Sequence, residues 1–358
     1  MYLLPKPKKF SQSEGQLLLS HHTGITMTRE VADTAHHAVI RLLEEVRHST
    51  GLMLRVSVGE AKPGDVFLTV EPGLQEQAYE LTIEETGIRI AGGDGAGVLY
   101  GVESLCQMLG QCGGSLPCCH LEDTPDMLYR GYYFDQTRGR VLKLEELKKI
   151  ADRMCRYKMN QLQLYVEHTY LFRDFSEMWR DQTPLTAEEI LEFDRYCRER
   201  HIELVPSLAS FGHLCELLST RTYGELCEME NSWQAPFSFL NRMRYHTINV
   251  SDDRSLPLIK SMITEYMSLF SSDKFNLCAD ETFCLGKYKS RALAEELGVH
   301  RLYVDYVKEL AEFLVDKGKI PMFWGDIIWK SPELLKELPE SMICLNWGYA
   351  PDQRENET

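Results

Sequence analysis

The first third of the chain mixes helical and strand-like spacing of apolar side chains. Residues 31–49 and 98–109 place apolar residues three or four apart, which predicts two amphipathic helices. Alternating apolar and polar residues predict short strands at 53–58, 66–70, 79–83 and 88–90. The last two strands flank a Glu-Glu-Thr-Gly turn and are typical of a hairpin. Residues 1–125 are therefore expected to form an α+β domain.

From residue 126 onward, strand-like and helical runs alternate. The expected strands are 129–135, 160–167, 202–208, 275–280, 320–327 and 342–347. The expected helices are 144–157, 187–200, 256–270, 302–316 and 332–338. Repeated strand–helix alternation predicts an α/β domain over 126–358, with a parallel sheet and helical crossovers.

Polar or aromatic residues stand at the carboxyl end of nearly every predicted strand, including Asp135, Glu167 and Asp280. A TIM (β/α)8 barrel gathers these ends into one site, so the pattern favours a barrel over a doubly wound sheet. Only six strands can be counted, whereas a closed barrel has eight. We therefore expect an incomplete barrel whose last strands are missing, with a polar stretch at 351–358 following the sixth strand.

Charge and composition narrow the function classes. The 358 residues include 39 Lys and Arg against 54 Asp and Glu, a formal charge of −15 that argues against nucleic acid and anionic membrane partners. Residues 1–10 lack the apolar core of a secretory signal, and no apolar run is long enough to span a membrane. The eleven cysteines are then expected to be reduced thiols in a cytoplasmic protein.

Two adjacent carboxylates carry the strongest chemical signal. The apolar strand near residue 275 runs directly into Asp280 and Glu281. Neighbouring carboxylates can divide acid and base roles, which suits cleavage of a glycosidic bond. Trp324 and Trp347, at the ends of later strands, could pack against a sugar ring. The plainer alternatives are a strand that ends in charged residues and tryptophans that fill the core.

The order of several motifs resembles glycoside hydrolase family 20, the β-N-acetylhexosaminidases, over nearly the whole chain. In the N-terminal region the resemblance rests on YELTIEETGIRI and GVLYGVESLCQML. In the barrel region it rests on YRGYYFDQTRGR, LVPSLASFGH, KFNLCADET, FWGDII and ICLNWGY. A family 18-type chitinase would need a DxxDxDxE run, which the sequence lacks.

The resemblance implies a retaining, substrate-assisted mechanism, in which the substrate's acetamido oxygen attacks the anomeric carbon to give an oxazolinium ion. Glu281 would be the general acid and then the base that activates water. Asp280 would orient the acetamido N–H and stabilise the developing positive charge. Because the nucleophile comes from the substrate, neither a metal nor an organic cofactor is expected.

The resemblance also assigns substrate-binding residues. Arg130 matches an arginine that grips sugar hydroxyls, and its alternative is a buried salt bridge to Asp135, which belongs to the same predicted site. Trp324 and Trp347 match the aromatic walls of the acetamido pocket. His213 matches a histidine in a network behind the catalytic acid.

Glu167 or His168 would fall near an acidic position of that network, with the register open by one residue. The chain departs from the family pattern where two glycines precede the catalytic pair, since Cys278 and Ala279 stand there instead. Cys278 could be proposed as a nucleophile, but we interpret it as a small packing residue.

We therefore predict a cytoplasmic exo-β-N-acetylhexosaminidase that releases terminal β-linked GlcNAc or GalNAc from an oligosaccharide or small glycoside. The rival hypothesis is a non-catalytic amino-sugar-binding remnant, because the family residues of strands seven and eight have no counterpart. On that ground we expect this chain alone to be inactive or weakly active unless another segment completes the barrel. Whether it forms a homo-oligomer stays open.

Overall fold

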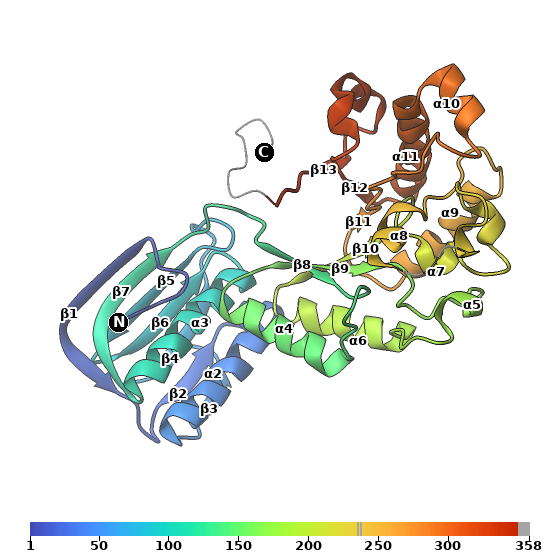
Figure 1. The fold of residues 1–358 in the computed structure, drawn as a ribbon. Helices are drawn as coiled ribbons and strands as arrows, with labels where there is room; N and C mark the ends of the chain where they lie inside the picture. The colour runs from blue at the N-terminus through green and yellow to red at the C-terminus, as the bar shows by residue number, and fades with distance from the viewer. Residues whose placement is uncertain (235, 237, 350–358) are drawn as a thin grey trace. The chain divides into compact units, whose positions relative to one another are not determined.

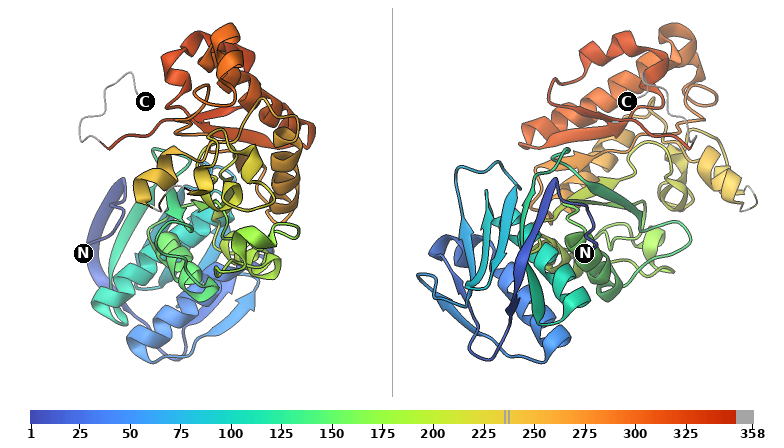
Figure 2. Two further views of the ribbon diagram at one scale, coloured as in Figure 1. Left: turned by 45° about the vertical axis from the view of Figure 1, so that its right-hand side comes forward. Right: turned by 90° about the vertical axis from the view of Figure 1, so that its left-hand side faces the viewer.

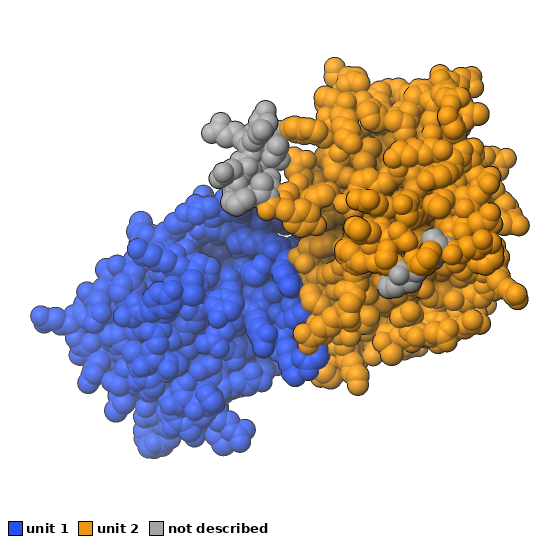
Figure 3. Space-filling view, viewed as in Figure 1, with its two compact units in different colours: residues 1–132, 146–161, 195–203 blue, residues 133–145, 162–194, 204–358 orange. Residues whose placement is uncertain are grey.

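The computed structural model describes residues 1–234, 236 and 238–349, and the chain folds into two compact units (Figure 3). The first unit holds residues 1–132, 146–161 and 195–203, and the second holds 133–145, 162–194 and the chain from Leu204 onward. Two later stretches thus group with the N-terminal residues. The expected boundary between residues 125 and 126 stays a prediction.

The first unit is built on a seven-stranded mixed sheet in the order β1-β7-β5-β6-β4-β2-β3. The predicted hairpin is confirmed, because β5 and β6 pair antiparallel. Three strands were not predicted: β1 is mostly polar and exposed, β2 has four residues, and β7 carries few alternating apolar positions. The bounds are β1 (Lys9–Leu18), β2 (Gly24–Met27), β3 (Arg55–Val58), β4 (Val66–Val70), β5 (Tyr79–Glu84), β6 (Gly87–Gly92) and β7 (Ser115–Asp123).

Helices α1 (Arg29–Thr34), α2 (His36–Thr50) and α3 (Gly95–Cys112) belong to the same unit, and α2 and α3 form a layer beside the sheet (Figures 1 and 2). The predicted single helix over 31–49 is wrong, because the backbone leaves helical geometry at Ala35. Helix α3 begins where the Asp94 side chain accepts a hydrogen bond from Gly97 N at 2.7 Å. A Cβ at Gly97 would lie 2.2 Å from Ala78 O, so only glycine allows this close packing on the sheet.

The second sheet has six strands in chain order, β8 to β13, and the pairs from β10 to β13 are parallel. All six predicted strands are confirmed. Within the described residues the sheet thus has six of the eight strands of a closed barrel. The predicted polar stretch at 351–358 lies outside the described residues. The bounds are β8 (Gly131–Asp135), β9 (Gln161–Val166), β10 (Glu203–Leu208), β11 (Lys274–Asn276), β12 (Ile320–Trp324) and β13 (Ile343–Leu345).

Helices separate these strands along the chain, as the alternation predicts. The main ones are α4 (Leu144–Arg156), α6 (Ala187–Arg198), α9 (Ser255–Met267) and α11 (Val299–Asp316). Helix α6 begins with a capping box, in which Thr186 and Glu189 exchange side-chain-to-backbone hydrogen bonds of 2.9 and 3.2 Å. The predicted helix at 332–338 is a 3₁₀ helix, η4 (Pro332–Glu337). No described helix is long and apolar enough to cross a membrane.

Shorter elements fill the connections between the strands. They are α5 (Ser176–Trp179), α7 (Cys215–Leu218), α8 (Phe239–Arg244), α10 (Arg291–Leu297), η1 (Gly224–Leu226), η2 (Ser232–Gln234) and η3 (Ile328–Lys330). Strand β9 is buried over its whole length, as expected of a parallel strand covered on both faces. Its Gln163 is not left unpaired, since Gln163 Oε1 accepts a hydrogen bond from Asn276 Nδ2 at 2.9 Å.

Candidate active site

The segment that follows β11 carries the two carboxylates on a tightly held backbone. Ser210 Oγ donates to Leu277 O at 2.6 Å, and Tyr303 Oη donates to Ala279 O at 3.0 Å. Tyr306 Oη donates to Ser210 O at 3.0 Å. Tyr303 and Tyr306 lie one turn apart on α11, so one helix fixes the segments after both β10 and β11.

This segment has unusual backbone geometry. Cys278, Ala279 and Glu281 have φ angles of 60°, 61° and 49°, in the left-handed region that costs an L-residue roughly 1–2 kcal/mol. Glycine adopts this region freely, which explains why the family pattern noted above has glycines at the first two positions. In the neighbouring loop a Cβ at Gly212 would lie 2.5 Å from Asp280 O, so that loop can approach Asp280 only as glycine.

His213 joins the two predicted catalytic carboxylates. Its buried Nε2 lies 3.3 Å from Asp280 Oδ2 and 3.4 Å from Glu281 Oε2, distances of ion pairs although the angles are not those of hydrogen bonds. Burial alone would lower the pKa of His213, but the two carboxylates outweigh it and raise the pKa to about 10. At neutral pH the ring is therefore an imidazolium between two acids.

The same three side chains have the spacing of a metal site. One ligand atom from each of His213, Asp280 and Glu281 lies within 4.8 Å of the others. Without an ion, the two carboxylates raise the pKa of His213 and hold a proton on its ring. Because a metal binds the neutral imidazole, an ion at this position would have to displace that proton.

Asp326, two residues beyond β12, is a site residue that the sequence prediction left without a role. Its Oδ2 accepts a hydrogen bond from Glu281 N at 3.1 Å. Burial, together with the charge of Asp280, raises the pKa of Asp326 to about 6. The position of Asp326 just beyond a predicted strand end could have indicated that it belongs to the site.

Asp135 and Glu167 each pair with an arginine. Arg138 Nε lies 2.6 Å from Asp135 Oδ2, and Arg242 Nη2 lies 2.9 Å from Glu167 Oε2. The charge of Glu167 contributes to the raised pKa of His213, which links this cluster electrostatically to Asp280 and Glu281. Of the two residues left open by the sequence, Glu167 is the one that pairs with an arginine.

Neither arginine was predicted as a site residue. Arg138 stands in the DQTR stretch after β8, where the resemblance drew attention to Arg130 instead. Arg242 lies on α8, inside a long connection whose sequence has no strand-end pattern. The Asp-x-x-Arg spacing in the motif shared with the family could have indicated Arg138. No sequence pattern indicated Arg242.

The two tryptophans have different surroundings. Trp324 packs edge-to-face against Tyr133, with ring centroids 5.1 Å apart. Trp347 is 37% exposed and lines a cavity of about 370 Å³ together with Glu281 and Asp326. An exposed aromatic face beside the carboxylates is the arrangement that a sugar site needs.

Cys278 precedes Asp280 by two residues and is almost fully buried. Its Sγ lies 3.4 Å from Ser207 Oγ, and burial raises the pKa of the thiol well above its usual range. A thiol that holds its proton in this way is a poor nucleophile. The structure therefore favours the packing role.

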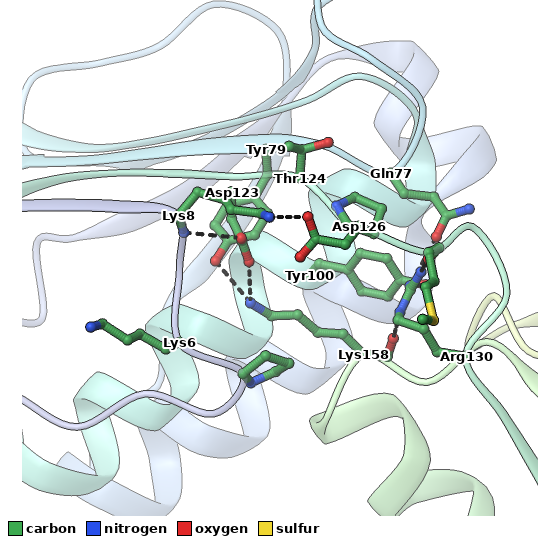
Figure 4. A pocket seen from close by; sticks show the side chains of 13 residues that line it. Lys6, Lys8, Gln77, Tyr79, Tyr100, Asp123, Thr124, Asp126, Arg130 and Lys158 are labelled. Atoms are coloured by element: carbon green, nitrogen blue, oxygen red, sulfur yellow. Dashed lines mark hydrogen bonds and ion pairs between the residues drawn. The ribbon is translucent and has the colours of Figure 1, made fainter. Parts of the chain in front are cut away.

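Arg130 belongs to the first unit, and its surroundings do not match the predicted sugar-gripping role (Figure 4). All five guanidinium N–H donors can be assigned to acceptors within the protein, so none is left for a sugar hydroxyl. The alternative of a salt bridge to Asp135 is wrong, because Asp135 pairs with Arg138. The acceptors are the backbone oxygens of Met127, Leu128 and Lys158 and the side-chain oxygens of Gln77 and Tyr100.

Glycoside hydrolase barrels use paired carboxylates and aromatic residues beyond the ends of parallel strands, which is the arrangement seen here. Comparison with known families agrees. Residues 1–124 match the model for glycosyl hydrolase family 20, domain 2, and residues 128–357 match the model for its catalytic domain. The chain belongs to glycosyl hydrolase family 20, which confirms the predicted family and fold.

Characterised relatives are distant in sequence but close in fold. The chain is 22% identical to the β-hexosaminidase of Porphyromonas gingivalis, over 91% of this chain and 45% of that protein. A β-N-acetylhexosaminidase from Bacteroides fragilis superposes with a TM-score of 0.77 at 22% identity, covering 96% of this chain and 69% of the other. An exo-β-N-acetylglucosaminidase from Vibrio harveyi, in complex with N-acetylglucosamine, gives 0.80 at 21% identity, covering 97% and 57%. The chain thus spans less than half the length of the Porphyromonas relative.

Proposed function

We propose that this protein is an exo-β-N-acetylhexosaminidase that removes terminal β-linked GlcNAc or GalNAc. The observation that carries the proposal is the pair Asp280 and Glu281, which lie on the segment after β11, with the His213 imidazolium 3.3 and 3.4 Å from their oxygens. Family membership and the names of the relatives point the same way. The N-acetylglucosamine bound in the Vibrio harveyi structure supports GlcNAc as one product.

The proposed reaction is retaining and substrate-assisted. Glu281 protonates the leaving oxygen while the substrate's acetamido oxygen attacks the anomeric carbon, which forms the oxazolinium ion. Asp280 orients the acetamido N–H and stabilises the positive charge. His213 remains protonated and stabilises the carboxylate that Glu281 becomes after giving up its proton. Glu281 then takes a proton from the water that opens the oxazolinium ion.

We assign the grip on the sugar hydroxyls to Arg138 instead of Arg130. Arg138 stands at the carboxyl end of β8, where Asp135 fixes its Nε and its guanidinium carbon lies 5.0 Å from the centre of the Tyr165 ring. Its Nη2 has no acceptor among the described residues, which leaves donors for a ligand. Asp135 acts by orienting this arginine, as Glu167 does for Arg242.

Trp324 and Trp347 remain our proposed walls of the acetamido pocket. We also propose that the protein acts in the cytoplasm, since all eleven cysteines are unpaired thiols. Neither a metal nor an organic cofactor takes part in this mechanism, and hydrolysis is expected to persist in EDTA.

The test measures both binding and turnover, because a sheet with six of the eight barrel strands could bind an amino sugar without hydrolysing it. Calorimetry would measure binding of the thiazoline of N-acetylglucosamine, which mimics the oxazolinium ion, and hydrolysis of an aryl β-N-acetylglucosaminide would be followed on the same sample. We expect binding that weakens at least about tenfold in Asp280→Asn, which loses a charged contact. Glu281→Gln should remove any turnover while largely sparing binding.

The outcomes separate the hypotheses. Binding with turnover supports the enzyme. Binding without turnover, even by wild-type protein, favours the amino-sugar-binding remnant. A folded sample that neither binds the thiazoline nor hydrolyses the glycoside would overturn the proposal for this chain.

A further inference from the structure

The first unit contains a pocket of about 320 Å³ that the proposed reaction does not use (Figure 4). Every residue that lines it belongs to this unit. Its walls combine the N-terminal segment around Lys6 and Lys8 with Tyr79, Tyr100 and Lys158. The volume lies at the lower end of the range for small-molecule sites, which suits a ligand of about one sugar ring.

The pocket carries a net positive charge in an acidic protein. Four cationic and two acidic side chains line it, so its formal charge is 4 − 2 = +2, against −15 for the chain. Lys8 pairs with Asp126, and Lys158 Nζ lies 3.2 Å from Asp123 Oδ2. Two cations remain without a carboxylate among the described residues, because Arg130 donates only to neutral acceptors and Lys6 has no ion-pair partner.

Lys158 is the buried cation of this pocket. Its side chain is only 5% exposed, and its Nζ donates to Tyr79 Oη at 2.8 Å and to Asp123. An ammonium has three donors, and the third has no acceptor among the described residues. Lys158 has a left-handed φ of 59° because it caps the carboxyl end of α4, where Met159 N donates to Met154 O at 2.9 Å. Burial lowers the pKa of Lys158 even beside Asp123.

We propose that this pocket binds a small organic anion, the size of one sugar ring and carrying one carboxylate or phosphate group. The third N–H of Lys158 and the ammonium of Lys6 donate to the anionic group. The positive charge of Arg130, held rigidly by five hydrogen bonds, adds attraction without a direct contact. Tyr100 and Met127 offer apolar surface to the body of the ligand.

The test is calorimetric titration of the full chain with glucuronate and with glucose 6-phosphate, and with glucose as the neutral control. The two anions distinguish a carboxylate ligand from a phosphate ligand. We expect at least one of them to bind and glucose not to bind. Lys158→Met should weaken binding by at least about tenfold, since it removes a buried charged donor. Lys6→Ala, at the exposed mouth, should weaken it by about two- to fivefold.

Lys9→Ala is the matched control. Lys9 is 71% exposed, pairs with Glu122 and does not line the pocket, so its loss removes the same charge elsewhere on the unit. If Lys158→Met fails to fold, the anion affinities of Lys6→Ala and Lys9→Ala are compared instead. The proposal is overturned if folded wild-type protein binds neither anion up to about 10 mM. It is equally overturned if Lys6→Ala and Lys9→Ala bind alike.

Discussion

Replacing His213 with glutamine should remove a large pH-dependent part of the protein's stability. The pKa of His213 is about 10 in the folded state and 6.5 ordinarily, a difference of 10 − 6.5 = 3.5. At about 1.36 kcal/mol for each pKa unit, the folded protein favours the protonated over the neutral His213 ring by roughly 5 kcal/mol, net of the burial penalty. Because the folded pKa is the higher one, this contribution is fully present below pH 6.5. It is lost as the pH rises through about 10.

The assay is urea unfolding of wild-type protein and His213→Gln at about pH 6.5 and pH 9.5. The difference in free energy of unfolding between the two proteins should shrink by roughly 3–4 kcal/mol over this interval. His168→Gln is the matched control. Burial lowers the pKa of His168 to about 4, so its ring is neutral at both pH values and the variant should keep the wild-type pH dependence. A His213→Gln variant that also keeps it would refute the assigned charge of His213.

Three further predictions concern substitutions elsewhere in the second unit. Ala279→Gly should raise the free energy of unfolding by up to about 1 kcal/mol, because glycine relieves a left-handed residue. As the matched control, Ala311→Gly inside α11 should lower the free energy of unfolding by at least about 1 kcal/mol. If denaturant unfolding shows that both glycine variants lose the same stability, the strain argument is contradicted. Glu228→Ala should lower the free energy of unfolding by at least about 2 kcal/mol, because the fully buried Glu228 carboxylate accepts hydrogen bonds from Ser290 N and Oγ. An unchanged melting temperature would count against a stabilising role for these hydrogen bonds. In a sample with turnover, Arg138→Lys should raise KM more than it lowers kcat, and unchanged kinetics would return the sugar-gripping role to another residue.

Strand order and the position of Asp280 and Glu281 just beyond a strand could be predicted because they depend on local patterns. Apolar runs that end in Asp280 or Glu167 mark the strand ends of a parallel sheet, and the sheet brings such ends together. The break in the first helix at Ala35 and the mostly polar strand β1 could not be predicted in this way, since tertiary contacts override weak local preferences there.

The arginines show the same limit at the level of the site. Arg130 and Arg138 lie eight positions apart in one motif, and the sequence does not say which one has free donors. Only the placement of acceptors around Arg130 settles that its guanidinium is fully used. Arg242 reaches Glu167 from α8, and a contact across 75 sequence positions leaves no local pattern.

The two tyrosine hydroxyls of α11 have a consequence for how the catalytic site tolerates change. Tyr303 and Tyr306 hold Ala279 O and Ser210 O, so one rigid helix sets the gap between the loop of His213 and the loop of Asp280. The helix thus fixes the backbone of each loop through one hydrogen bond. Substitutions that rotate or shift α11 would displace His213 relative to Asp280 and Glu281, although Tyr303 and Tyr306 themselves do not line the cavity beside Glu281. In a library of random variants, the inward face of α11 should therefore tolerate substitution as poorly as the catalytic loops themselves.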